Sequence, residues 1–233
     1  MKTIGILGGI GPQATMELEA RIHRVAQRRL PQHANEGYPP LVTVFMRHAP
    51  VRVDEERLPI EPRQADPRLF EAARRLGEWA DVIVVPSNTP HQFLDRLREA
   101  AGVEILNMIQ ITLDEVLRRG VQPVGVMGIG RVHVYLEPLR ERSIPVLFPD
   151  DEIQGRLDRA ILRLMEGAEG DDERSVAAAA LAQLRERGAG QIVLGCSEIP
   201  LLLGPAADAE DLVDPVQLLA EAAVEAAIDE PNG

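Results

Sequence analysis

Eight short apolar runs, rich in β-branched residues, alternate with helical patterns along the 233-residue chain, and this alternation constrains the fold more than any other feature. The runs lie near residues 3–7, 41–46, 82–86, 103–106, 124–127, 144–148, 191–195 and 211–213. Continuous apolar runs of this length are typical of parallel strands, because helices cover both faces of a parallel sheet. The pattern therefore predicts an α/β fold whose strands are joined by right-handed crossovers.

The eight runs divide into two sets of four that correspond in order. This repeat predicts two pseudo-symmetric lobes, each a parallel sheet of about four strands flanked by helices. Helices are expected at Thr15–Arg29, Leu69–Trp79, Gln92–Ala101, Ile109–Arg118, Ile153–Glu166, Glu173–Glu186 and Pro215–Ile228. Polar and proline-rich stretches predict surface loops at Glu55–Pro67 and Glu166–Glu173.

Charge and composition exclude several classes of protein. A hydrophobic fraction of 45% supports a sizeable core, and a net charge of −12 argues against a nucleic-acid surface, which needs clustered cations. No run approaches membrane-spanning length and no secretory leader opens the sequence, so we expect a cytoplasmic protein with no membrane partner. An anionic substrate would need a local positive site, for which the candidates are Arg47, Arg52, Arg131 and Arg156.

Two of the apolar runs end in the same way, and their ends carry most of the functional information. The sequences that follow the strands are Ser87-Asn88-Thr89-Pro90-His91 and Cys196-Ser197-Glu198-Ile199-Pro200. Each begins with a nucleophilic side chain, continues with hydrogen-bonding groups and ends near a proline, as at a strand–turn–helix junction. Thr89 is expected to cap a helix that Pro90 opens. Ligands of open α/β sheets bind at such strand ends, so we expect the two turns to face one shared cleft.

Cys196 is the only cysteine, so an internal disulfide and a thiolate metal cluster are excluded. The five histidines have no metal-ligand spacing, and no metal is expected. A lone cysteine in a strand region is often a small buried apolar residue. At a strand end that faces a helix N-terminus, however, backbone amides and the helix dipole favour the thiolate, and we predict that Cys196 is reactive.

A glycine turn follows the first strand, within Gly8-Gly9-Ile10-Gly11-Pro12. Such a turn lets backbone amides approach an anion, so Gly9, Ile10 and Gly11 are predicted to bind a carboxylate. The alternative is a tight turn that needs glycine for structural reasons alone. A dinucleotide site is disfavoured, because Pro12 lacks an amide hydrogen and the second strand ends at Arg47, where a ribose-binding acid would stand.

These motifs resemble those of the cofactor-independent aspartate/glutamate racemase family over almost the whole chain. The resemblance is carried by the glycine turn, by the Ser87 and Cys196 turns, and by Val213-Asp214-Pro215. It implies two flavodoxin-like lobes, residues 1–98 with 208–233 and residues 99–207, and a homodimer. It also implies racemisation of an amino acid, as in aspartate and glutamate racemases, without pyridoxal phosphate or another cofactor, with a small-molecule amino acid or dicarboxylate as the substrate.

The resemblance also assigns roles to individual residues. Cys196 corresponds to one of two family cysteines that exchange protons with opposite faces of the α-carbon, and Ser87 stands where the other is expected. Asn88, Thr89, Ser197 and Arg52 match carboxylate-binding positions. Glu198 and His91 complete the predicted site, with His91 as the nearest candidate base for the Ser87 hydroxyl. Aspartate-specific members of the family carry a lysine near the position of Gln154. Gly155 aligns with that lysine in this chain, so the substrate side chain is expected to differ from aspartate.

Replacing a thiol by a hydroxyl leaves three hypotheses open. The first is an amino-acid racemase with Cys196 as the principal base and Ser87 as a weaker partner, because serine needs an adjacent base to lose its proton. The second is a decarboxylase or isomerase of small dicarboxylic acids that uses one thiol. The third is a non-catalytic binder of small carboxylates that retains only the cleft.

Overall fold

The computed structural model describes residues 1–34, 36–54, 60 and 62–228, and the chain forms two compact units. The first unit comprises residues 1–108 and the chain from Val216 onward, and the second comprises Ile109–Pro215. Each unit is described by itself below. The elements of the first unit are β1 (Ile4–Gly8), α1 (Pro12–Arg29), β2 (Leu41–Phe45), α2 (Pro67–Gly77), β3 (Val82–Val84), the 3-10 helix η1 (Thr89–Phe93), α3 (Leu94–Ala101), β4 (Glu104–Ile105) and α9 (Pro215–Ile228).

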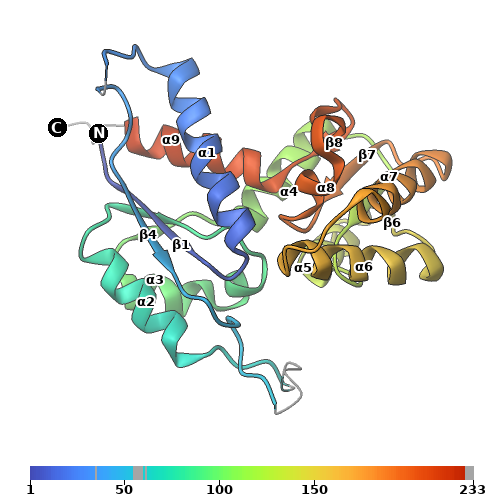
Figure 1. The fold of residues 1–233 in the computed structure, drawn as a ribbon, viewed down its shortest axis with the longest axis horizontal. Coiled ribbons are helices and arrows are strands. Elements are labelled where there is room, and N and C mark those ends of the chain that lie inside the picture. Colours follow the sequence, from blue (N-terminus) through green and yellow to red (C-terminus); the bar gives the residue numbers. More distant parts are fainter. Residues whose placement is uncertain (35, 55–59, 61, 229–233) are drawn as a thin grey trace. The chain divides into compact units, whose positions relative to one another are not determined.

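The first unit is a four-stranded parallel sheet in the order β2-β1-β3-β4. Every residue of β1 and β3 is buried, as the continuous apolar runs predict for central strands. Helices α2 and α3 pack on one face of the sheet, while α1 and α9 lie on the other (Figure 1). Arg29 at the end of α1 pairs with Glu225 of α9 at 3.7 Å, which ties the last helix to this unit.

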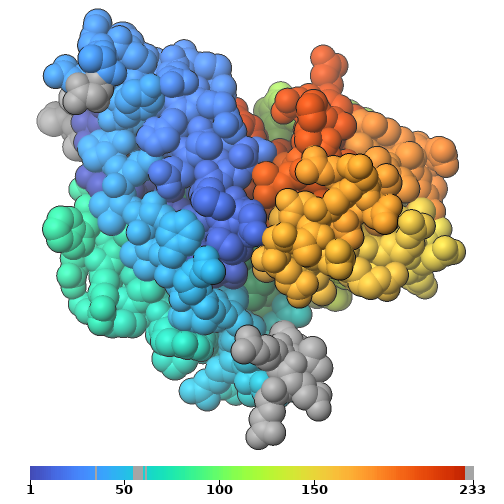
Figure 2. Space-filling view, viewed as in Figure 1, coloured from blue at the N-terminus to red at the C-terminus, as the bar shows by residue number. Residues whose placement is uncertain are grey.

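The second unit repeats this plan with a parallel sheet in the order β6-β5-β7-β8. Its elements are α4 (Met108–Arg119), β5 (Val124–Met127), α5 (His133–Glu141), β6 (Val146–Leu147), α6 (Asp151–Met165), α7 (Asp171–Glu186), β7 (Gln191–Leu194), α8 (Ile199–Leu203), the 3-10 helix η2 (Gly204–Asp208) and β8 (Leu212–Val213). Helices α6, α7 and α8 share one apolar cluster with the sheet. In Figure 2 residues of α6 and α7, yellow to orange, form much of the visible surface of this unit.

The strand orders fix where each unit can bind a ligand. In both sheets successive strands are added first on one side of the starting strand and then on the other. The order switches between the two central strands, which are β1 and β3 in the first unit and β5 and β7 in the second. A crevice opens at the carboxyl ends of strands at such a switch point. The Ser87 turn follows β3 and the Cys196 turn follows β7, so each predicted turn lies at the switch point of its own unit.

The α/β fold with two four-stranded parallel sheets is confirmed, and all eight strands occur where the sequence predicts them. Helix α5 was not predicted, and α8 was predicted only as the helix start that follows the Cys196 turn. Pro138 lies inside α5, and α8 has five residues, so neither gives a helical pattern in the sequence. Part of the predicted surface loop Glu55–Pro67 lies outside the described residues.

The predicted boundaries after residues 98 and 207 are displaced from those of the structure, which fall after Met108 and Pro215. The physical reason is strand pairing. β4 pairs with β3 of the first sheet, and β8 pairs with β7 of the second, so each strand remains with its own unit.

Within the described residues, none of the helices is long and apolar enough to cross a membrane.

Candidate active site

The Ser87 turn leaves β3 through the buried residues Val85 and Pro86, and the Ser87 amide donates to the Val85 carbonyl at 2.9 Å. Ser87, Asn88 and Thr89 are all partly exposed at this strand end. The capping role predicted for Thr89 is wrong: the residue is the first of the 3-10 helix η1, and the flanking Asn88 makes no side-chain capping bond. The side chains of the turn are therefore not committed to a helix cap.

His91 supports this turn from behind. Its Nδ1 lies 2.8 Å from the Ser87 carbonyl oxygen, and its Nε2 accepts from the Met108 amide at 3.2 Å. The ring therefore carries its hydrogen on Nδ1, which donates to the carbonyl. Burial lowers the pKa of His91, which keeps the ring neutral. Because both ring nitrogens contact backbone groups, the proposal that His91 is the base for the Ser87 hydroxyl is wrong, and its role is to hold the turn.

The lowered pKa of His91 predicts a pH-dependent stability. The neutral ring stabilises the fold above the ordinary histidine pKa of 6.5. This contribution is lost as the pH falls below that pKa, since the unfolded chain then binds the proton more readily. In urea titrations between about pH 7.5 and about pH 5, we expect His91→Gln to remove about 1 kcal/mol of the acid-induced loss. His133→Gln, which removes an exposed imidazole, is the control. Equal pH profiles for wild type and His91→Gln would contradict the assignment.

The Cys196 turn follows β7 and is organised by one buried carboxylate. Glu198 has 3% of its surface exposed, and its Oε2 accepts from the Cys196 thiol and from the Ser197 hydroxyl, both at 3.0 Å. Cys196 and Ser197 are partly buried, and Cys196 packs against the apolar cluster of α6, α7 and α8. The thiol therefore has an acceptor for its proton in direct contact.

Burial raises the pKa of the Cys196 thiol well above its usual value, and the Glu198 carboxylate raises it further. Hydrogen bonds from the backbone amides of Glu198 and Ile129 act in the opposite direction but are smaller. The amides thus favour the thiolate as predicted, but they are outweighed, because the sulfur is buried and a carboxylate faces it, while α8 is only five residues long. Loss of the proton requires a base or a compensating positive charge.

A second turn lies beside Cys196, at residues 128–130 after β5. The amide of Gly130 donates to Asp158 Oδ1 at 2.9 Å. Gln154 Nε2 also donates to this oxygen at 2.7 Å, and to the Gly128 carbonyl at 2.8 Å. Asp158 is not among the predicted site residues, because its position is set by the packing of α6 on the sheet. The four-residue spacing of Gln154 and Asp158, one helical turn, is the signal that could have found the pair.

Behind these turns, Tyr135 of α5 is fully buried, and burial raises its pKa. Its side chain bonds to the buried Thr112, and the charges of Asp214 and Cys196 act on its hydroxyl. Tyr135 and Thr112 thus form a neutral polar contact beneath the sulfur-bearing turn.

The glycine turn after β1 is held by protein groups. The Gly9 amide donates to Thr15 Oγ1 at 2.8 Å, and the same hydroxyl donates to the Gly11 carbonyl at 2.9 Å. Carboxylate binding by the Gly9 amide is therefore wrong, since that amide already has a partner within α1. Ile10 is partly exposed and Gly11 is the N-cap residue of α1. Their predicted contact with a carboxylate stays a prediction.

Gly9 is needed for the close approach of β2. Its φ is +73°, and an added Cβ would lie 2.5 Å from Phe45 Cα and 2.6 Å from the Met46 nitrogen. We expect Gly9→Ala to destabilise the protein by about 2–5 kcal/mol, from left-handed strain plus overpacking. Gly102→Ala is the matched control, because Gly102 has φ +69° and no atom near its added Cβ. It should cost only the strain, about 1–2 kcal/mol. Equal losses in urea unfolding would contradict this reading.

Arg52 lies in an exposed segment that pairs with residues near Gln64. Its amide donates to the Gln64 carbonyl at 2.8 Å, and its guanidinium reaches Gln64 Oε1 at 3.5 Å. The neighbouring Val51 is buried and bridges to Ala65. The backbone of Arg52 is thus fixed while its guanidinium is exposed, as a carboxylate-binding role requires.

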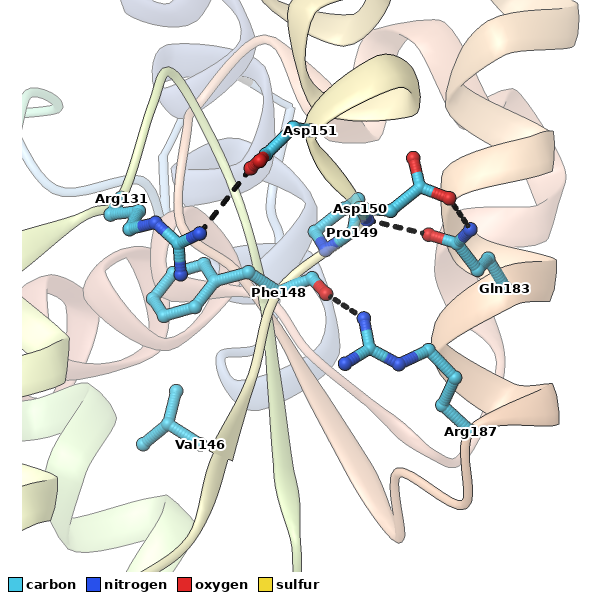
Figure 3. A pocket seen from close by; sticks show the side chains of 8 residues that line it. All are labelled: Arg131, Val146, Phe148, Pro149, Asp150, Asp151, Gln183 and Arg187. Carbon is cyan, nitrogen blue, oxygen red and sulfur yellow. Dashed lines mark hydrogen bonds and ion pairs between the residues drawn. The ribbon is translucent and has the colours of Figure 1, made fainter.

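A cavity of about 450 Å³ lies in the second unit at the end of the edge strand β6 (Figure 3). The Arg131 guanidinium lies 5.5 Å from the centre of the Phe148 ring and 3.4 Å from Asp151. Arg187 donates to the Phe148 carbonyl, and Gln183 bonds to Asp150. The predicted catalytic residues do not line this cavity. The guanidinium of Arg131, one of the candidate anion-binding residues, therefore already contacts the Phe148 ring and the Asp151 carboxylate.

The described residues contain no cluster of three or more histidine, cysteine, aspartate or glutamate side chains suited to a metal ion.

Comparison with curated proteins gives a relative of stated activity. Over 114 residues the chain is 25% identical to the broad specificity amino-acid racemase RacX of Bacillus subtilis strain 168. The matched segment covers 48% of this chain and 48% of RacX, so the match spans about half the length of either protein.

Solved structures match over almost the entire chain. The aspartate racemase of Picrophilus torridus superposes with a TM-score of 0.75 at 20% identity, covering 97% of this chain and 94% of that chain. An aspartate racemase homologue from Pyrococcus horikoshii OT3 gives a TM-score of 0.72 at 22% identity, covering 98% and 100%. At these identities the likeness establishes the fold. The sequence of residues 7–223 matches the Asp/Glu/Hydantoin racemase family, and the chain therefore belongs to that family.

Proposed function

We propose that the protein is an amino-acid racemase in which Cys196 removes the α-proton as a thiolate and Ser87 exchanges a proton with the opposite face of the α-carbon. The observation that carries the proposal is the contact of the Cys196 thiol with the buried Glu198 carboxylate at 3.0 Å, at the switch point of its sheet. A thiol with an adjacent base has the arrangement that nucleophilic and proton-transfer chemistry needs.

Glu198 accepts the thiol proton, and the thiolate then takes the α-proton, leaving the electron pair on the α-carbon. The Ser87 hydroxyl delivers its proton to the other face. Water then reprotonates the Ser87 alkoxide, and the hydroxide that forms takes the proton held by Glu198, which restores the starting state. The substrate's α-ammonium group supplies positive charge near Glu198, which offsets the carboxylate that raises the pKa of Cys196.

The substrate carboxylate needs hydrogen-bond donors, and we propose that Asn88, Thr89 and Ser197 provide them, with Arg52 as the cationic group. The partial exposure of the first three residues supports this, as does the exposed guanidinium of the fourth. Ser197 would exchange its present bond to Glu198 for one to the substrate, since a hydroxyl has a single hydrogen to donate.

We propose further that the reaction uses no pyridoxal phosphate. That cofactor forms a Schiff base with a lysine, and the only lysine of the chain is Lys2. Lys2 lies at the amino end of β1, where its amide bonds to the Ala227 carbonyl. The Ser87 and Cys196 turns follow the carboxyl ends of their strands, so a cofactor on Lys2 would lie at the wrong edge of the sheet.

The test is to incubate the protein with single enantiomers of acidic, neutral and basic amino acids and to follow the opposite enantiomer by chiral chromatography. Conversion that approaches equal amounts of both enantiomers, without added cofactor, supports the proposal. Binding of amino acids without conversion or α-proton exchange would overturn it and favour a carboxylate binder.

A second candidate is favoured by one observation, the single thiol. A decarboxylase needs to protonate only one face of the carbanion, which Cys196 alone can do. Release of carbon dioxide from a substituted malonate, with no conversion of any amino acid, would establish this activity in place of racemisation.

A further inference from the structure

One turn connects the Cys196 sulfur to a carboxylate that the reaction does not use. In residues 128–130, the Ile129 amide bonds to the sulfur and the adjacent Gly130 amide bonds to Asp158 Oδ1. Neighbouring amides in a peptide chain are about 3–4 Å apart, and each bond adds about 3–4 Å, so Asp158 lies roughly 10 Å or less from the sulfur. The side chain of an amino acid whose α-carbon contacts Cys196 would lie within reach of Asp158.

The hydrogen-bond partners of Asp158 are neutral groups. Its hydrogen bonds come from neutral donors, the Gly130 amide and Gln154 Nε2. Across the described part of the chain, no arginine, lysine or histidine forms an ion pair with Asp158 or Glu198. Arg156 and Arg159, on the same helix α6, are exposed. Two carboxylates thus stand near the thiol without an ion pair among the described residues, since Arg131, which follows Gly130, pairs with Asp151 instead.

Gln154 fixes the position of Asp158. Its amide nitrogen bonds to both the Gly128 carbonyl and the carboxylate, while its Oε1 is buried and has no hydrogen-bond partner among the described residues. A buried acceptor without a partner is destabilising, so the orientation of the amide is set by the two bonds of its nitrogen. The carboxylate therefore cannot turn away from the Gly130 turn without losing both donors.

We infer that Asp158 selects the substrate side chain, and that the protein acts on amino acids with neutral or basic side chains in preference to aspartate and glutamate. The inference rests on the proposed racemase function. A second carboxylate on the substrate would add a like charge to Asp158 and Glu198, whereas a cationic side chain would be attracted. The Bacillus subtilis relative is itself named a broad specificity amino-acid racemase.

The test measures α-deuterium incorporation in deuterated water for aspartate, glutamate, alanine, methionine, lysine and arginine. We expect kcat/KM for the neutral and basic substrates to exceed that for the acidic ones by at least about tenfold. Asp158→Asn keeps an acceptor for Gly130 and Gln154 but removes the charge. The variant should raise kcat/KM for the acidic substrates relative to alanine by about thirtyfold. This is the effect expected from removing the repulsion between two like charges about 8 Å apart at an effective dielectric constant of about 20.

Glu152→Gln is the matched control, because it removes an exposed carboxylate from the same helix and should leave the substrate order unchanged. A wild-type preference for aspartate or glutamate, or an Asp158→Asn order equal to that of wild type, overturns the inference while leaving the racemase proposal intact. Exchange with none of the six substrates overturns both. Should Asp158→Asn fail to fold, the wild-type substrate order alone decides.

Discussion

Cys196→Ala is expected to abolish α-proton exchange. In deuterated water, incorporation of deuterium into the substrate should fall by at least about a thousandfold, because the variant lacks the group that accepts the α-proton. The pKa of the thiol is raised in the free protein, so the wild-type rate should increase with pH through the neutral range as more thiolate forms. Nuclear magnetic resonance of the α-proton signal measures both effects.

Folding and catalysis are separable in this experiment. Cys196 is partly exposed and contacts the cluster of α6, α7 and α8 with a small side chain, so Cys196→Ala should change the free energy of unfolding by about 1 kcal/mol or less. Cys196→Ser keeps a hydrogen-bonding group of similar size, yet it should remain nearly inactive because a hydroxyl does not ionise at neutral pH. Retained exchange in both variants, with the fold intact, would exclude Cys196 as the base.

Ser87 variants are expected to separate exchange from inversion. Ser87→Ala should reduce conversion between enantiomers by about a hundredfold, while Cys196 continues to exchange the α-proton of one enantiomer. Ser87→Cys supplies a second thiol and should increase conversion by about tenfold or more over wild type. Because enantiomers have equal free energies in water, kcat/KM must be the same in both directions, so any asymmetry appears only as exchange without inversion.

The control for these variants is Ser175→Ala, which removes an exposed hydroxyl on α7 and should change neither rate. The measurement combines α-deuterium content with chiral separation for each starting enantiomer. If Ser87→Ala converts enantiomers as fast as wild type, a different group protonates the second face, and the role proposed for Ser87 is wrong.

The fold could be predicted because its determinants are local and repeated. Strands buried on both faces require continuous apolar runs, and β1 and β3 show these runs directly. The helices with apolar faces were likewise predictable, with ends shifted by a few residues. Helix α5 was not predicted because Pro138 interrupts its pattern, whereas the turn residues indicated the start of α8 but its five residues are too few to show a helical period.

The chemistry of the site was less predictable, because pKa values depend on which groups tertiary packing brings together. The sequence indicated that Cys196 ends a strand, but the burial of Glu198 against the sulfur reverses the expected effect on the thiol. In the same way, His91 follows Ser87 closely, yet its two ring nitrogens contact the Ser87 carbonyl and the Met108 amide, so it does not serve as a base for the hydroxyl. Asp158 reaches the Gly130 turn only through the packing of α6.

The most direct test of the two-group mechanism is the isotope content of both enantiomers early in the reaction. Wild-type protein in deuterated water should place deuterium in the newly formed enantiomer while the remaining starting enantiomer keeps its hydrogen, since Cys196 removes the proton from one face and Ser87 delivers a deuteron to the other. Deuterium appearing equally in both enantiomers from the start would show that one group serves both faces, and would contradict the account.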